Sequence, residues 1–290
     1  MSKKRWTGLL YLAPVLFLII AFFPYPSISI IRTSFYTTKY GINFEFAGLK
    51  NYRIIFQDEV FRASLINSLK WTVSGMLLQL IIPLGTALLL NQKFRGNGLA
   101  RAAMLVPWIT PGVIIAIMAR WILEPEMGML NDVLLRIGVI GDPINFLGSP
   151  TAALPTLIVA QTWQFIPFGT LLILAALQTI PRELYEAMKV DGAGALQLFR
   201  HLILPRLQPM IGFVGFLAFV WNFNVFDKIW LTTQGGPVNA TMTLPVMVYK
   251  RAFRTFRLGQ SSAVATITVI SLIVLGIIYF KYLWKPTKEE

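Results

Sequence analysis

The chain has 290 residues, of which 56% are hydrophobic and 13% are charged, and its formal net charge is +13. Because a soluble domain carries about 25% charged residues, much of this surface must face something other than water. Cysteine is absent, which excludes a disulfide framework and a cysteine metal site. The basic residues are scattered along the chain instead of clustered, so the net charge does not indicate nucleic-acid binding.

Apolar segments long enough to cross a bilayer recur along the chain. A helix needs about 20 apolar residues for this, and such segments lie at approximately 8–31, 70–90, 102–123, 153–178, 207–231 and 261–284. The sequence therefore predicts an all-α polytopic membrane protein, with residues 1–290 forming one domain of six transmembrane helices. The first segment is longer than the apolar core of a signal peptide and lacks a small-residue cleavage site, so we expect it to be retained.

The connection at 91–101 predicts the orientation of the chain. It is short and its charged residues are all basic, which favours the cytoplasmic side. The basic residues assigned to the other side equal the cytoplasmic ones in number, but they lie mostly in two long segments, 32–69 and 232–260, where the rule gives them little weight. We therefore expect both termini to be cytoplasmic.

Three shorter features are predicted between the spans. Residues 58–69 are expected to form an interfacial helix before the second span, and residues 242–257 an amphipathic helix in the outer interface. The run Thr-Gln-Gly-Gly-Pro at 233–237 indicates a turn. Prolines at 107, 111 and 167 are expected to bend their helices and make room for a cavity.

Residues 181–205 form a charged, amphipathic connection between two apolar segments. Pro181 suits the start of a helix, and Leu184, Ala187 and Met188 would share one apolar face of it. Glycines at 192 and 194 suit a sharp turn into a second short helix, which a proline at 205 is expected to end. An interfacial helix resting on lipid is the alternative, although anionic lipid would repel the acidic residues at 183, 186 and 191.

The spacing of residues in this segment resembles the EAA loop of permease subunits of binding-protein-dependent ABC importers. The residues that match the family pattern are Glu186, Ala187, Gly192, Leu204 and Pro205, while Met188 and Leu202 replace the second Ala and the Ile. The Gly-Gly-Pro turn at 235–237 is similar to one in sugar permeases of the maltose-transporter type. The resemblance implies the type I ABC importer permease fold in its compact six-span form.

The resemblance also implies how the segment would act. It would bind a cytoplasmic ATPase subunit, with an ionic contact from Glu186, a bend at Gly192 and an apolar contact from Leu196 and Phe199. The docking residues that we predict are Glu186, Ala187, Asp191, Gly192, Leu196, Phe199 and Pro205. The implied partners are a homologous second permease, two ATPase subunits, an extracytoplasmic solute-binding protein and the lipid of the cytoplasmic (inner) membrane.

No enzymatic activity is expected of the chain itself. A phosphate-binding loop of the Gly-x-x-x-x-Gly-Lys-Ser/Thr type is absent from the sequence, so ATP and magnesium would be bound by the ATPase subunits and this chain would hold no cofactor. The one histidine, His201, is expected to be a solvated loop residue, and no metal site is predicted.

Aromatic and amide residues at membrane depth predict a translocation pathway. Such polar groups are costly in a bilayer unless they face a cavity or a partner. Amides bond hydroxyl groups as donors and acceptors, and aromatic faces suit the apolar faces of sugar rings, so a neutral lining of this kind favours a neutral carbohydrate. By position in the resembled family, the candidates are Trp108, Gly112, Gln161, Trp163, Phe165, Phe168, Trp221, Asn222 and Val225.

Several alternatives stay open at this point. Each of these residues could instead join two helices or anchor a span at the interface, and the substrate contacts could lie in the second permease. A glycerol-phosphate-type cargo would require Arg or Lys in the pathway, which we do not expect at depth in these spans. In a different class, the chain would be a stand-alone channel or secondary transporter, although repeated halves and intramembrane charges would then be expected.

Overall fold

The computed structural model describes residues 3–39 and 43–283, and almost all of its regular structure is helical. The chain divides into two compact units. One contains Met1–Arg62 and Met247–Ile270, and the other contains Ala63–Val246 and Ser271–Glu290. Within the described residues, five helical stretches are long and apolar enough to cross a membrane, and a bent pair of helices would make a sixth. The expected all-α class is confirmed.

The first unit begins with helices and a small hairpin. Its elements are α1 (Lys3–Phe22), α2 (Pro24–Ser34), β1 (Tyr36–Lys39), β2 (Asn43–Phe46) and α3 (Lys50–Gln57). The two strands are antiparallel, with Tyr36 paired to Phe46. The amide of Asn51 fixes the start of the hairpin, because its Nδ2 donates to the carbonyl oxygens of Ser34 at 2.8 Å and Tyr36 at 2.9 Å.

The first part of the segment predicted as an outer amphipathic helix is buried by protein. It forms α14 (Leu244–Tyr249), which continues into the π-helical turn η2 (Lys250–Arg254). Leu244 is 0% exposed and Met247 is 2% exposed, so these two residues do not lie on lipid as expected, whereas Phe253 of the same predicted face is 62% exposed. In the first unit, Arg251 forms an ion pair with Asp58 and also donates to Gln260, which gives a basic residue of this segment protein partners.

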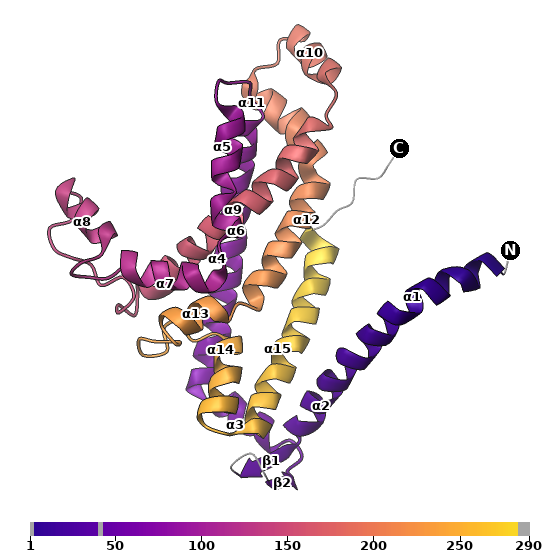
Figure 1. The fold of residues 1–290 in the computed structure, drawn as a ribbon, viewed down its shortest axis with the longest axis vertical. Coiled ribbons are helices and arrows are strands. Elements are labelled where there is room, and N and C mark those ends of the chain that lie inside the picture. The colour runs from indigo at the N-terminus through magenta and orange to yellow at the C-terminus, as the bar shows by residue number, and fades with distance from the viewer. Residues whose placement is uncertain (1–2, 40–42, 284–290) are drawn as a thin grey trace. The chain divides into compact units, whose positions relative to one another are not determined.

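Long helices form the core of the second unit. These are α4 (Glu59–Leu90), α9 (Ala153–Gln178), α12 (Leu204–Phe223) and the end of α15 (Leu258–Ile278), which runs into the π-helical turn η3 (Tyr279–Leu283). Figure 1 shows α4, α9 and α12 side by side, and buried residues of all three share one cluster that includes Ala87, Ile173 and Val214. The hydroxyl of Tyr279 donates to the carbonyl oxygen of Gly212 at 2.7 Å and so attaches the last turn to α12.

The second span begins earlier than predicted. Instead of a separate interfacial helix over 58–69, α4 runs without a break from Glu59. Asp58 precedes it, and its Oδ1 accepts a hydrogen bond from the backbone N–H of Val60 at 2.7 Å, as an N-terminal cap does. Because no glycine or proline interrupts the helix until Gly75, nothing in the sequence separates the two parts.

The third predicted span is broken. It consists of α5 (Asn97–Met104), α6 (Val106–Ile109) and α7 (Gly112–Ile122), and the helix direction changes by 95° after Ile109. Thr110 has an extended backbone, as expected for a residue before a proline. The bend expected at Pro111 is therefore confirmed, and the segment predicted as a span over 102–123 consists of helices that meet at this bend. Pro167 lies inside the unbroken α9. The helix α8 (Met129–Arg136) follows α7 (Figure 1).

The fifth span also ends earlier than predicted. Helix α12 stops at Phe223 and is followed by the short helix α13 (Asp227–Thr232), so a span continuing to residue 231 is wrong. The amide of Asn224 contributes to this ending, because its Nδ2 donates to the carbonyl oxygen of Val220 at 2.8 Å. The expected turn follows, with left-handed backbone angles at Gln234 and Gly235.

Candidate translocation cavity and docking segment

A cavity of about 420 Å³ lies in the second unit among α6, α9, α12 and α13. We call it the aromatic cavity, and its lining residues are Trp108, Gln161, Gln164, Phe165, Val220, Trp221, Asn224, Val225, Asp227 and Lys228. Five of the predicted pathway residues are therefore brought together here: Trp108, Gln161, Phe165, Trp221 and Val225.

Four aromatic rings form one cluster at this cavity. The ring of Trp108 stacks on Phe168 with centroids 4.7 Å apart, and on Trp221 with centroids 5.7 Å apart. Phe165 meets both Phe168 and Trp221 edge to face. Such arrangements contribute about 0.5–1.5 kcal/mol per pair beyond the burial of area. Phe168, another predicted residue, is not itself in the lining but packs against three aromatic residues that are.

The break after Ile109 brings a further predicted residue to the cavity. Gly112 begins α7, and a Cβ atom there would lie 2.6 Å from Oδ2 of Asp227. A side chain at this position would displace the carboxylate, so glycine leaves room for Asp227 beside the start of α7. The amide of Gln164 bonds the carbonyl oxygen of Thr110 at 2.9 Å, which the break leaves without a helical partner.

Two predicted pathway residues lie elsewhere. Trp163 is 43% exposed and is not among the lining residues. Asn222 is 1% exposed, and its Nδ2 donates to Oε1 of Gln79 and to the carbonyl oxygen of Ala218, both at 2.7 Å. An amide with these partners joins α12 to α4 and has no donor left for cargo. A pathway role for either residue remains a prediction that this geometry does not support.

The neutral lining that we expected is wrong, because Asp227 and Lys228 belong to the cavity. The ammonium group of Lys228 donates to Oε1 of Gln161. A sequence signal was present, since these adjacent charges interrupt the apolar segment predicted as the fifth span. Gln164 and Asn224 were also missed as individual site residues, although both lie within the amide and aromatic runs that suggested the pathway.

The docking segment has the two helices that its pattern predicts. Helix α10 (Arg182–Val190) follows Pro181, and α11 (Ala195–Leu198) leads into the π-helical turn η1 (Phe199–Ile203). Gly192 has a φ of +79° between them, which confirms the expected turn. The backbone N–H of Gly194 donates to Oε1 of Gln197 at 2.8 Å and fixes the start of α11.

Most of the predicted docking residues are at the surface. Glu186, Ala187, Asp191 and Gly192 are exposed, and Leu196 is 76% exposed. Phe199 is half-buried. On the other side of α10, Leu184 and Met188 pack against the core of the second unit. The segment thus rests on its own unit by one face and leaves acidic and apolar side chains available for a partner. His201 is exposed, as expected.

Pro205 does not end the second docking helix. The helical path is continuous from Ala195 to Phe223, and the π-helical turn at 199–203 directly precedes the proline. A proline inside a helix lacks the N–H for one hydrogen bond and its ring crowds the preceding turn. One wider turn before it relieves that conflict, so the expectation of a helix stop at this proline is wrong.

Comparison with known proteins agrees with this architecture. Residues 60–285 match the family described as "Binding-protein-dependent transport system inner membrane component". The trehalose/maltose transport system permease protein MalF of Thermococcus litoralis is 32% identical over 286 residues, covering 96% of this chain and 94% of MalF. The sn-glycerol-3-phosphate transport system permease protein UgpA of Yersinia pestis is 30% identical, covering 98% of this chain and 96% of UgpA.

A solved structure matches the fold over almost its whole length. It is a bacterial ABC transporter involved in the import of the acidic polysaccharide alginate, with a TM-score of 0.86 and 23% identity, covering 99% of this chain and 98% of that one.

The chain belongs to the inner-membrane permease family of binding-protein-dependent transport systems. It is a multi-pass permease of an ABC importer and not the ATPase that drives one. Membership in this family excludes the alternative that the chain is a stand-alone channel or secondary transporter. The expected family of binding-protein-dependent ABC permeases is therefore confirmed.

Proposed function

We propose that the chain forms half of the pathway through which an ABC importer carries a sugar or oligosaccharide. The aromatic cavity supports this most directly, because indole and phenyl faces lie beside the amides of Gln161 and Gln164. Aromatic faces fit the apolar faces of sugar rings, and amides bond their hydroxyl groups. The relative MalF, named for trehalose and maltose transport, is consistent with such a cargo.

The other half of the pathway would come from a homologous second permease. This chain offers one docking segment, whereas two ATPase subunits that close together require one each. An extracytoplasmic solute-binding protein would deliver the cargo, as the family description indicates. The docking segment would lie in the cytoplasm together with both termini, since the 91–101 connection beside it is basic.

Coupling would occur through the exposed face of the docking segment. Glu186 would contribute the charged contact with the ATPase, and Leu196 the apolar one. Affinity purification of the tagged chain tests this, using the Glu186→Lys and Gly192→Asp variants and Glu126→Lys as a control at another exposed acid. We expect an ATPase subunit and a second permease to copurify with the wild type and the control, and the ATPase to be lost from both docking variants. Its retention by both would contradict the docking role.

A second cargo class is favoured by one observation. Lys228 lines the aromatic cavity and would attract a phosphate or carboxylate group on a polar solute. UgpA, named for sn-glycerol-3-phosphate transport, is a relative of comparable identity. The cargo of this chain would then be a glycerol-phosphate-type or other acidic solute.

Uptake measurements decide between the two cargo classes. Cells that express the full transporter would be offered labelled neutral disaccharides, acidic saccharides and glycerol phosphate in parallel. We expect saturable uptake of a neutral saccharide, reduced in the Trp108→Ala variant. Uptake confined to anionic solutes, and abolished by Lys228→Gln, would replace the neutral carbohydrate by the second class.

A further inference from the structure

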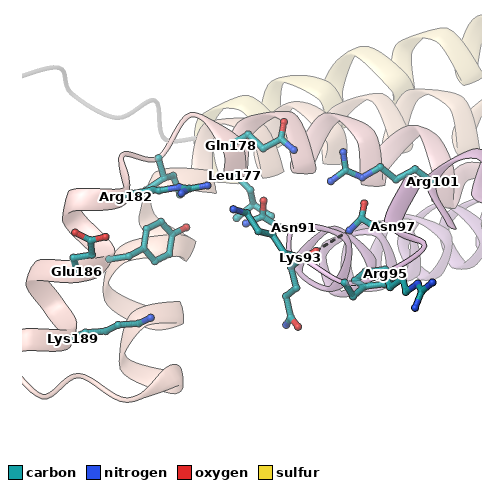
Figure 2. A pocket seen from close by; sticks show the side chains of 14 residues that line it. Asn91, Lys93, Arg95, Asn97, Arg101, Leu177, Gln178, Arg182, Glu186 and Lys189 are labelled. Atoms are coloured by element: carbon teal, nitrogen blue, oxygen red, sulfur yellow. Dashed lines mark hydrogen bonds between the residues drawn. The ribbon is translucent and has the colours of Figure 1, made fainter. Parts of the chain in front are cut away.

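A second, larger cavity of about 1000 Å³ lies beside the docking segment, and we call it the basic pocket. It is bounded by the segment after α4, by the end of α9 and by α10. Figure 2 shows Arg182, Glu186 and Lys189 of α10 on one side of it, and Arg95, Asn97 and Arg101 on the other.

The charge of the basic pocket is unbalanced. Its basic lining residues are Lys93, Arg95, Arg101, Arg182 and Lys189, and its acidic lining residue is Glu186. Both ion pairs found among the described residues, Arg136 with Asp132 and Arg251 with Asp58, lie elsewhere. No cation of the pocket therefore forms an ion pair in the described part of the chain.

Part of the wall is held in place before any ligand arrives. Nη2 of Arg101 donates to the carbonyl oxygen of Leu90 at 2.8 Å, and Nδ2 of Asn97 donates to the same oxygen at 2.9 Å. Nδ2 of Asn97 also reaches the carbonyl oxygen of Gln92 at 2.8 Å. These bonds cap the end of α4 and fold the following segment back toward it, so the basic side chains there start from a fixed backbone.

Two buried donors of the lining lack an acceptor. They are Nε of Arg101 and the hydroxyl of Tyr185, neither of which has a hydrogen-bond partner in the described structure. Burial raises the pKa of Tyr185, so its hydroxyl keeps its proton and remains a donor at neutral pH. Because buried polar groups in proteins are nearly always paired, this combination calls for an occupant rich in acceptor oxygens.

The position of the pocket indicates the source of those oxygens. It lies where the membrane-spanning helices α4 and α9 end, which is the level of the lipid headgroups. Leu177 and Ile180 bring apolar surface to the same lining. Basic pockets between membrane helices bind anionic headgroups in this way. Of the three acidic residues of the docking segment, Glu183 and Asp191 do not belong to the lining, and the five basic lining residues outnumber Glu186.

We propose that the basic pocket binds the phosphate of an anionic membrane phospholipid such as phosphatidylglycerol. Lys93, Arg95 and Arg101 would contact the phosphate from one side, Lys189 from the other, and Tyr185 would donate to it from within. The bound lipid would connect the 91–101 segment to α10. It would thereby hold the docking segment at a fixed distance from the membrane surface. This site does not depend on the cargo, and its occupant would be a structural lipid rather than a transported one.

The test compares lipid retention by the purified full-length chain in its transporter complex. Bilayer nanodiscs would contain phosphatidylglycerol and phosphatidylcholine in equal amounts, and native mass spectrometry would count the lipids that each protein keeps. The pocket variant is Lys93→Gln with Arg95→Gln. Its matched control is Lys250→Gln with Arg257→Gln, which removes the same charge from exposed residues of the other unit. We expect the pocket variant alone to lose the preference for phosphatidylglycerol by about tenfold or more.

A variant without a charge change keeps the test independent of general electrostatics. Tyr185→Phe removes one donor and is expected to lower retention by about threefold or more. Equal retention by the wild type and both pocket variants would overturn the proposal, and so would an equal loss in the control pair. Displacement of the lipid by millimolar inorganic phosphate would assign the site to a free anion. Photo-cross-linking from residue 93 to an ATPase subunit in place of lipid would assign it to a protein.

Discussion

The aromatic cavity and the basic pocket differ in how far their polar groups satisfy one another. In the cavity, the ammonium group of Lys228 already bonds Gln161, and Gln164 bonds Thr110. In the pocket, the basic residues have no carboxylate partner among the described residues, and two buried donors have no acceptor. Both regions are lined by side chains of the same unit.

This difference implies two modes of binding. Cargo that bonds the polar groups of the cavity must replace bonds that they now make, such as that of Lys228 to Gln161. An anion entering the pocket replaces no internal bond. We infer that the cavity binds its ligand transiently during the transport cycle, whereas the pocket binds its ligand stably.

The largest effect is expected where a polar residue near the cavity is structural. Asn222→Ala would leave Gln79 buried without its partner, which costs about 1–3 kcal/mol of stability. Thermal unfolding of the detergent-solubilised protein measures this loss. The double variant Gln79→Leu with Asn222→Leu removes both polar groups and should recover most of it. If Asn222→Ala kept full stability and lost only cargo binding, Asn222 would belong to the pathway after all.

A smaller effect is expected at the aromatic lining. Trp108→Ala removes the ring that stacks on both Phe168 and Trp221, and we expect the apparent affinity for a saccharide to fall about tenfold. Concentration-dependent uptake by cells measures it. Trp163→Ala is the matched control, because that side chain is exposed outside the cavity. Equal losses in the two variants would remove the distinction between the two tryptophans.

A smaller change still is expected at the charge in the cavity. Lys228→Gln keeps a donor near Gln161 and removes the positive charge, so neutral saccharide uptake should stay within about threefold of the wild type. Uptake of anionic solutes, if the transporter accepts any, should fall further. A loss of neutral uptake as large as that of Trp108→Ala would show that the charge is needed for the pathway itself.

The smallest effect is expected when the salt concentration is raised, and it should differ between the aromatic cavity and the basic pocket. The Debye length falls from about 10 Å at 0.1 M to about 3 Å at 1 M ionic strength. Lipid retention at the exposed cations of the basic pocket should therefore weaken with salt, while the affinity for a neutral cargo in the aromatic cavity should not. Parallel titrations of both properties measure this, and an identical salt dependence would contradict the proposed division.

The sequence predicted well what depends on neighbouring residues. Apolar length located α9 at its observed bounds, and the motif spacing located the two docking helices and the turn at Gly192. Each of these follows from local periodicity or from the backbone freedom of one glycine.

What the sequence did not predict depends on contacts between distant segments. Asn222 and Gln79 are 143 positions apart, and nothing local distinguishes an amide that joins two helices from one that faces a cavity. The end of α12 at Phe223 was not predicted, because apolar residues continue beyond it. For the same reason, the sequence did not place Asp227 and Lys228 in the cavity. The donors left unpaired in the basic pocket became visible only once α10 and the 91–101 segment were placed together.

The π-helical turn before Pro205 has a mechanical consequence. Because the helical path is unbroken from Ala195 to Phe223, its 29 residues act as one rod, about 43 Å long at ~1.5 Å per residue. One end carries Leu196, and the other carries Trp221. A tilt of about 5° about the docking end would displace the far end by about 4 Å, roughly the rise of three residues. A helix that ended at Pro205 would have separated these two ends by a non-helical connection. The continuous helix therefore connects the docking segment directly to the aromatic ring stack.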